Sequence, residues 1–244
     1  MANRRQVVAA WGLVAVAVAM MLFQGFLARR VVAKSPTVED LAIRVAALEA
    51  KLACVTAASS TTDVFFEGCN VHVQNGLGST SGSPTNSFGN LILGYNEGAG
   101  LDRNGSHNLV IGQGHSYASY GGLVAGSGNT VSGPNASVAG GSLNMATAAN
   151  ASVSGGRSNQ AISPGASVSG GTQNIAGVSL SVGQDASVSG GFQNVASGFA
   201  SSVSGGSGNE ASANRASVSG GSGCTLSGSD EWGAIPSGGV IGDC

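Results

Sequence analysis

The chain has 244 residues, of which 41 are glycine, and only 9% are charged, against roughly a quarter in an ordinary globular protein. The formal net charge of −2 argues against a nucleic-acid-binding protein, which presents a basic face. Glycine and serine at this level are also typical of flexible linkers. A linker needs no regular spacing of apolar residues, however, and this chain has one, so we expect a repeat protein.

An uncharged segment at residues 7–28 follows a short N-terminal tail, residues 1–6. At about 1.5 Å per residue it is long enough to cross a bilayer as a helix. A cleaved signal peptide is the alternative, although its apolar stretch usually has only about 7–15 residues. We expect a membrane anchor, then a linker at 29–36, with the head exported to the cell surface or periplasm, or secreted if residues 1–28 are cleaved.

Residues 37–56 show a heptad pattern of apolar side chains, which predicts a short coiled-coil stalk. The predicted seam consists of Val38, Leu41, Val45, Leu48, Leu52 and Val55. Ser35 with Pro36, or Thr37 with Asp40, supplies a helix start. The alternative is a single amphipathic helix that lies against its own head or a membrane. Three heptads are too few to hold an oligomer together alone, so we expect the head to determine the number of chains in the oligomer.

The chain has four cysteines, Cys54, Cys69, Cys224 and Cys244. An even number in an exported protein indicates two disulfides, with three possible connectivities. Pairing by proximity in sequence joins Cys54 to Cys69 and Cys224 to Cys244, one bridge near each end of the glycine-rich region. Four free thiols are the alternative. No pair has Cys-x-x-Cys spacing, so a zinc or redox motif is not indicated.

The phrase Ser-Val-x-Gly-Gly recurs at intervals of 15, 15, 20, 15 and 15 residues within 130–226. Its central valines are Val138, Val153, Val168, Val188, Val203 and Val218. A second register contains Asn129, Asn144, Asn159, Asn174, Asn194 and Asn209, with Cys224 in the next place. Two residues after each of these positions stands a small or apolar side chain, from Val131 to Leu226. A fixed period of this kind predicts stacked supersecondary units.

Fifteen residues rich in glycine are too few for a helical unit, and alternating Ser-Val-Ser favours strands. Glycine and asparagine supply the turns. We therefore predict a mainly β fold, a parallel β-solenoid or β-roll with two short strands per coil and an asparagine ladder between coils. Residues 227–244 form the predicted C-terminal cap, with Trp232 and Ile235 covering the last apolar positions, Val218 and Leu226.

Residues 57–129 form a predicted neck and irregular first coils. Ile92, Val110 and Val124 stand where the later valines stand, and residues 70–74 are a possible earlier member. The residues on either side of Ile92, Val110 and Val124 are apolar, which indicates that both faces of these early strands pack against other surfaces. Five extra residues within 177–185 are expected to bulge from one coil. The early aromatic residues are expected to form a core in the neck, or alternatively a binding patch; they are Phe65, Phe66, Phe88, Tyr95, Tyr117 and Tyr120.

One valine and one alanine per coil bury too little apolar surface to offset the entropy of ordering fifteen residues. We therefore expect the roll to self-associate as a parallel homo-oligomer.

The recurring segment "ASVSGGRSNQAIS" (151–163) resembles the head repeats of trimeric autotransporter adhesins, the YadA-like heads, over roughly residues 90–228. The resemblance implies a left-handed parallel β-roll, a homotrimer set on a coiled-coil stalk, and a role in cell adhesion. Here the stalk precedes the head, the reverse of the order in that family.

These features predict a non-enzymatic, adhesin-like binding head with an extracellular matrix, glycan or cell-surface ligand. The alternative is a structural spacer or an element of an envelope or surface layer. We expect no catalytic, cofactor or metal site, because the acids of the regular roll, Asp185 and Glu210, are not neighbours in register. No Gly-x-Ser-x-Gly elbow occurs. His72, His107 and His115 are expected to be surface residues of the irregular coils.

Overall fold

The computed structural model describes residues 35–57, 62–82 and 84–233. These residues divide into two compact units between Val71 and His72. Within the described ranges, no helix is long and apolar enough to cross a membrane. The anchor predicted at 7–28 lies outside the described residues, so it stays a prediction.

Helix α2 (Val38–Lys51) begins the first unit with a capping box at Thr37. The Thr37 hydroxyl oxygen accepts a hydrogen bond from the Asp40 backbone N–H at 3.1 Å. In return, the Asp40 carboxylate accepts one from the Thr37 backbone N–H at 2.9 Å. The Thr37 hydroxyl also donates to this carboxylate at 2.7 Å. The bonds from the Thr37 backbone N–H and hydroxyl favour the charged carboxylate and lower the pKa of Asp40. The predicted helix start is therefore observed, and two of the unpaired N–H groups of the first turn are satisfied.

The helix ends five residues earlier than the predicted stalk, which reached residue 56. Leu52 caps the C-terminus of α2, and Val55 begins strand β1 (Val55–Ala57), which pairs antiparallel with β2 (Val64–Phe66). Val55 therefore cannot be the last position of a helical seam. No residue of α2 is buried within this chain. The seam is thus free to contact another chain, and the coiled coil stays a prediction.

A disulfide joins Cys54 to Cys69, across the base of the β1–β2 hairpin. This is the predicted local pairing at the N-terminal end of the glycine-rich region. Cys224 is fully buried in the roll. Its predicted partner, Cys244, lies outside the described residues, so the second pairing stays a prediction.

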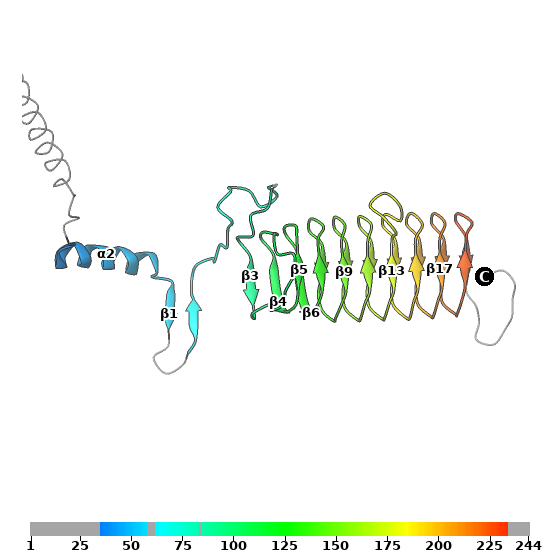
Figure 1. The fold of residues 1–244 in the computed structure, drawn as a ribbon, viewed down its shortest axis with the longest axis horizontal. Helices are drawn as coiled ribbons and strands as arrows, with labels where there is room; N and C mark the ends of the chain where they lie inside the picture. The colour runs from blue at the N-terminus through cyan, green and yellow to red at the C-terminus, as the bar shows by residue number, and fades with distance from the viewer. Residues whose placement is uncertain (1–34, 58–61, 83, 234–244) are drawn as a thin grey trace, which may run out of the picture. The chain divides into compact units, whose positions relative to one another are not determined.

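The second unit is a parallel β-solenoid, seen in Figure 1 as a row of successive coils. Its larger sheet has ten strands. These are β3 (Leu91–Leu93), β4 (Leu109–Gln113), β6 (Leu123–Ser127), β8 (Ser137–Val138), β10 (Ser152–Val153), β12 (Ser167–Val168), β14 (Ser187–Val188), β16 (Ser202–Val203), β18 (Ser217–Val218) and β20 (Trp232–Gly233). We call this the valine sheet.

The other sheet has eight strands and supplies the second wall of each coil. Its strands are β5 (Ser116–Tyr117), β7 (Thr130–Val131), β9 (Met145–Ala146), β11 (Gln160–Ala161), β13 (Ile175–Ala176), β15 (Val195–Ala196), β17 (Glu210–Ala211) and β19 (Thr225–Leu226). We call this the alanine sheet. The predicted solenoid, with coils of about 15 residues and two short strands per coil, is confirmed.

The register places valine on valine from β4 to β18 of the valine sheet. Ile92 pairs with Val110, Val110 with Val124, and Val124 with Val138, so the irregular coils join the regular ones without a slip. The five extra residues leave as an enlarged loop between β13 and β14, visible in Figure 1. Residues 70–74 form no strand.

The core of the regular coils consists mostly of small side chains, because the two sheets of each coil lie close together. The predicted valines of 138–218 and the alanines of the second register are at most 1% exposed. A third inward row, not predicted, stands two residues before each valine: Ala136, Ala151, Ala166, Ala186, Ser201 and Ala216. Each coil therefore buries more surface than one valine and one alanine, which weakens the expectation that a single roll needs a partner in order to fold.

The second glycine of each Gly-Gly pair is required by the close approach of successive coils. Gly156 has φ +83°, and a Cβ atom there would lie 2.1 Å from the carbonyl oxygen of Gly171. Both the left-handed backbone and the contact exclude any side chain. The glycine content thus reflects how tightly the coils stack.

The asparagine register forms a continuous ladder inside the roll. The Asn159 side chain accepts a hydrogen bond from the backbone N–H of Asn174 at 2.9 Å. Its amide nitrogen donates to the carbonyl oxygens of Gly155, in its own coil, and Gly171, in the next, each at 2.9 Å. The same three bonds recur at Asn144, Asn174, Asn194 and Asn209.

We call each side-chain position of this ladder a rung. The ladder extends beyond the asparagines, because His115 occupies the position of a rung in an earlier coil. His115 is fully buried, so the expectation that it is a surface residue is wrong. Its Nδ1 accepts from the Asn129 N–H at 3.2 Å, and its Nε2 contacts the Ile111 carbonyl oxygen at 3.0 Å. A backbone donor on one side and a carbonyl on the other require the neutral ring with the proton on Nε2. The amide oxygen of Asn96 continues the ladder by accepting from the His115 N–H at 2.6 Å.

The last described coil differs from the predicted cap. Gly233, not Trp232, pairs with Val218 at the inward position, and Trp232 is 69% exposed. Its indole N–H donates to the Ser219 hydroxyl at 2.8 Å. Ile235 lies outside the described residues. An exposed ion pair between Arg215 and Asp230 joins the last two turns and lowers the pKa of Asp230.

Replacing one rung should destabilise the roll strongly. Asn159→Ala leaves a buried backbone N–H and two carbonyl oxygens without their side-chain partner. We expect the free energy of unfolding to fall by about 2–4 kcal/mol, measured by urea unfolding followed by circular dichroism. The exposed Ser154→Ala in the same coil is the control, expected to change it by less than about 0.5 kcal/mol. Equal effects of the two substitutions would contradict the ladder.

The histidine rung should accept asparagine but not an apolar side chain of similar size. His115→Asn retains an acceptor and a donor at the rung, so we expect a loss of no more than about 1 kcal/mol. His115→Leu leaves the Asn129 N–H and the Ile111 carbonyl unpaired, and should cost more than about 2 kcal/mol. Thermal unfolding of the two full-length variants compares them. A leucine variant as stable as the asparagine variant would show that the rung bonds contribute little.

Candidate binding surfaces of the roll

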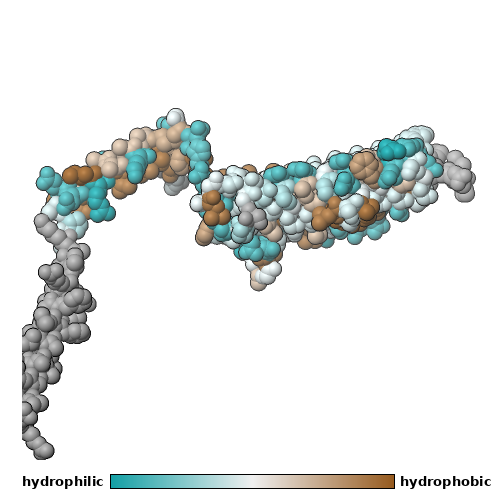
Figure 2. All heavy atoms as spheres, turned by 90° about the horizontal axis from the view of Figure 1, so that it is seen from above, coloured by the Kyte–Doolittle hydropathy of each residue, from teal (hydrophilic) through white to brown (hydrophobic). Residues whose placement is uncertain are grey.

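The outer face of the valine sheet carries rows of serine, since a serine precedes the buried valine in each regular coil and, except at Ala139, another follows it. Ser152, Ser167 and Ser187 stand in register on neighbouring strands, about 4.8 Å apart. Two of these hydroxyls, on Ser202 and Ser217, are hydrogen-bonded to each other at 3.0 Å. The serine rows therefore make this face polar and uncharged where they run, and they repeat from coil to coil. Figure 2 views the roll from one side and shows a white and teal surface with a few brown spots.

The N-terminal end of the same sheet is apolar instead. Its outward positions, which we call the apolar end, are Leu91, Leu93, Leu109, Ile111 and Leu123. Leu91 and Leu93 are 49% and 52% exposed. Ile92 is 43% exposed although it occupies an inward position. The sequence predicts that these apolar residues pack against another surface. The described part of this unit does not supply that surface.

The outer face of the alanine sheet is hollowed into a groove that crosses three coils. The groove has a volume of about 360 Å³ and is lined by Ser158, Gln160, Gln173, Ile175, Gln193 and Val195. We call it the glutamine groove. No ionisable side chain lines it, so it suits an uncharged ligand.

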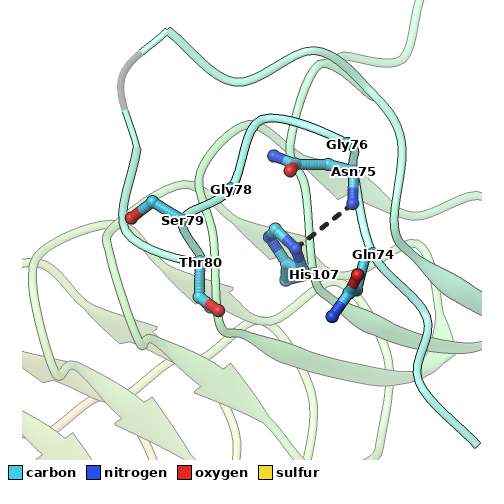
Figure 3. A pocket seen from close by; sticks show the side chains of 7 residues that line it. All are labelled: Gln74, Asn75, Gly76, Gly78, Ser79, Thr80 and His107. Carbon is cyan, nitrogen blue, oxygen red and sulfur yellow. Dashed lines mark hydrogen bonds between the residues drawn. The ribbon is translucent and has the colours of Figure 1, made fainter.

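A second hollow, shown in Figure 3, lies beside His107 in the irregular N-terminal part of this unit. It has a volume of about 310 Å³ and is lined by Gln74, Asn75, Gly76, Gly78, Ser79, Thr80 and His107. The Asn75 backbone N–H donates to His107 Nε2 at 3.4 Å. The lining contains no carboxylate to pair with the histidine in acid–base chemistry. Across residues 35–57, 62–82 and 84–233, no three His, Cys, Asp or Glu side chains are grouped to hold a metal ion.

Most of the early aromatic residues do not form the predicted neck core. Only Tyr117 is buried, at the inward position of β5, where later coils have alanine. Tyr95 is 94% exposed. The other large exposed aromatic side chains of this group are Phe65, Phe66 and Phe88. The two acids of the regular roll stay apart in register, with Asp185 in an exposed turn and Glu210 on the outer face of β17.

No family model matches the chain, and no curated protein matches it. The likeness to adhesin heads therefore rests on the repeat and on the parallel solenoid that the repeat forms.

Proposed function

We propose that this protein is a membrane-anchored, surface-displayed β-roll head that acts as a non-enzymatic, adhesin-like binding module. The observation that carries the proposal is the repetition of uncharged hydroxyl and amide side chains on the outer faces of the coils. Weak contacts repeated along one axis add up through avidity, without any deep pocket. A surface of this kind suits long or repetitive ligands such as matrix fibres and glycans.

The covalent and sequence features of the N-terminal part support display outside the cytoplasm. The Cys54–Cys69 disulfide is characteristic of oxidising compartments. The apolar segment at 7–28 supplies an anchor or an export signal. In this arrangement the helix and the hairpin separate the anchor from the head along the chain.

Self-association belongs to the same proposal, as a parallel homotrimer like those of the adhesin heads that the repeat resembles. Two surfaces favour it. Every residue of α2 is exposed, so nothing in the described part of the chain covers the predicted seam. The apolar end of the valine sheet exposes leucines that association would remove from water.

Binding is tested with cells that display the full-length protein. We expect them to adhere to immobilised collagen, fibronectin or mucin more strongly than cells carrying the empty vector. Adhesion should disappear when the head is shaved from intact cells by protease. Display without adhesion to any of these surfaces would count against the binding role.

The oligomer is tested by light scattering on the full-length protein in mild detergent, with the detergent mass subtracted. We expect the mass of three chains. The paired substitutions Leu91→Ser and Leu93→Ser, on exposed positions, should weaken association by removing apolar area from the contact. Ser152→Ala and Ser154→Ala are the matched control. A folded monomer of the unaltered protein would contradict the trimer.

A structural spacer is the second candidate, favoured by the uniform register of the small-residue core. Such a rod needs no ligand. Electron microscopy of the cell envelope separates the two roles, because a spacer or layer protein forms regular arrays whereas a binding head stands as isolated projections.

A further inference from the structure

We propose that the glutamine groove is a binding site for a neutral saccharide chain that lies along the roll axis. This inference rests on the proposed binding function and names the class of ligand and the residues that hold it. It is carried by the shape of the groove, the chemistry of its lining and the two facing glutamine amides on one of its walls.

The floor of the groove is formed by three neighbouring strands of the alanine sheet. Gln160, Ile175 and Val195 are paired in register on β11, β13 and β15. They stand at outward positions, since the residue after each is a fully buried alanine. At the usual spacing of about 4.8 Å, the floor extends about 10 Å along the axis. That length accommodates a short oligosaccharide.

One wall is formed by Ser158, Gln173 and Gln193, which directly precede the asparagine rungs of the same coils. The two glutamine side chains are exposed, and they contact each other through a long hydrogen bond of 3.3 Å. A primary amide has two donors and two acceptor lone pairs, so one such bond leaves most of its capacity for a ligand. Hydroxyl groups of a sugar both donate and accept, and they match this wall.

The lining has no ionised side chain, which disfavours an anionic or cationic ligand. The nearest charges stand at its margins: Arg157 precedes Ser158, and Glu210 pairs with Val195. Ile175 and Val195 give the floor an apolar surface that suits the C–H face of a sugar ring. Phe192, which precedes Gln193 and is 44% exposed, adds an aromatic surface to the same coil. A site with amide groups around apolar contacts suits a neutral, hydroxyl-rich molecule.

The backbone shows how the wall can be tested without disturbing the coils. Gln173 and Gln193 adopt φ of 58° and 56°, the left-handed region that favours glycine. The same register holds glycine in three other coils, at Gly128, Gly208 and Gly223, and a side chain in two more, at Leu143 and Ser158. The two glutamine side chains are exposed, so packing does not require them. Substitution by glycine would therefore remove both amides and relieve the left-handed backbone.

The test uses the full-length protein in mild detergent and a double variant, Gln173→Gly with Gln193→Gly. The probes are the tetrasaccharides of chitin, cellulose and starch, with a tetrasaccharide of polygalacturonate as the charged comparison. Isothermal titration calorimetry measures affinity, and light scattering and thermal unfolding monitor assembly and stability. The matched control is Gln113→Ala, an exposed glutamine outside the groove.

We expect a neutral tetrasaccharide to bind the unaltered protein and the Gln113→Ala variant equally, and the charged one to bind at least tenfold more weakly. The double variant should lose at least tenfold in affinity while its melting temperature stays the same or rises, because glycine relieves the left-handed backbone. Retained affinity in the double variant overturns the groove assignment, as does preferred binding of the charged sugar. A change in the oligomeric mass of the double variant also overturns the groove assignment, because it would mean that a second copy of the chain covers the groove.

The two proposals fail separately. If no sugar binds but cells displaying the protein still adhere to matrix, the groove assignment is wrong and the binding function stands. If neither occurs, both are wrong.

Discussion

The buried amide of each asparagine rung holds the coils of this protein together. One side chain bonds to the backbone of its own coil and of the next, and the side chain itself, as at Asn159, is fully buried. A buried amide with all its partners is stabilising, whereas one that lost a partner would be costly, so the register of the whole roll follows from the rungs. The coils must then approach closely, which explains why Gly156 and its equivalents have no room for a Cβ. It also explains why the core consists mostly of valine and alanine.

Because the interior is built from a fixed set of small residues, variation is confined to the outward positions. On the valine sheet these change from leucine in β3 to serine in β10, while the inward residue stays Ile or Val. On the alanine sheet they include the glutamines of the groove. Any recognition by this head must therefore be encoded in the outward rows, and the constant spacing of coils presents those rows at regular intervals, as a multivalent binder requires.

Much of the fold could be predicted from the sequence, because residues 15 positions apart stack on one another in neighbouring coils. The inward valines, the asparagine register and the bulge before β14 are all visible in the spacing. The inward alanine of "Ala-Ser-Val" is also visible in the spacing, because it stands two residues before the valine and alternates with an outward serine. The role of His115 does not follow from residue type, since the register otherwise contains asparagine. It follows from place, because imidazole satisfies the same backbone groups. The groove could not be predicted, since its wall and floor come from three coils and from left-handed turns that the repeat does not reveal.

Amide hydrogen exchange, followed by NMR on the full-length protein, tests the ladder most directly. The backbone N–H groups that donate to a rung, those of Asn144, Asn159, Asn174, Asn194 and Asn209, should be among the slowest to exchange in the chain. The N–H groups of the exposed turns should exchange much faster, because opening a turn breaks no buried amide bond. If the rung N–H groups exchange as fast as those of the turns, the asparagine ladder is not what holds the coils together.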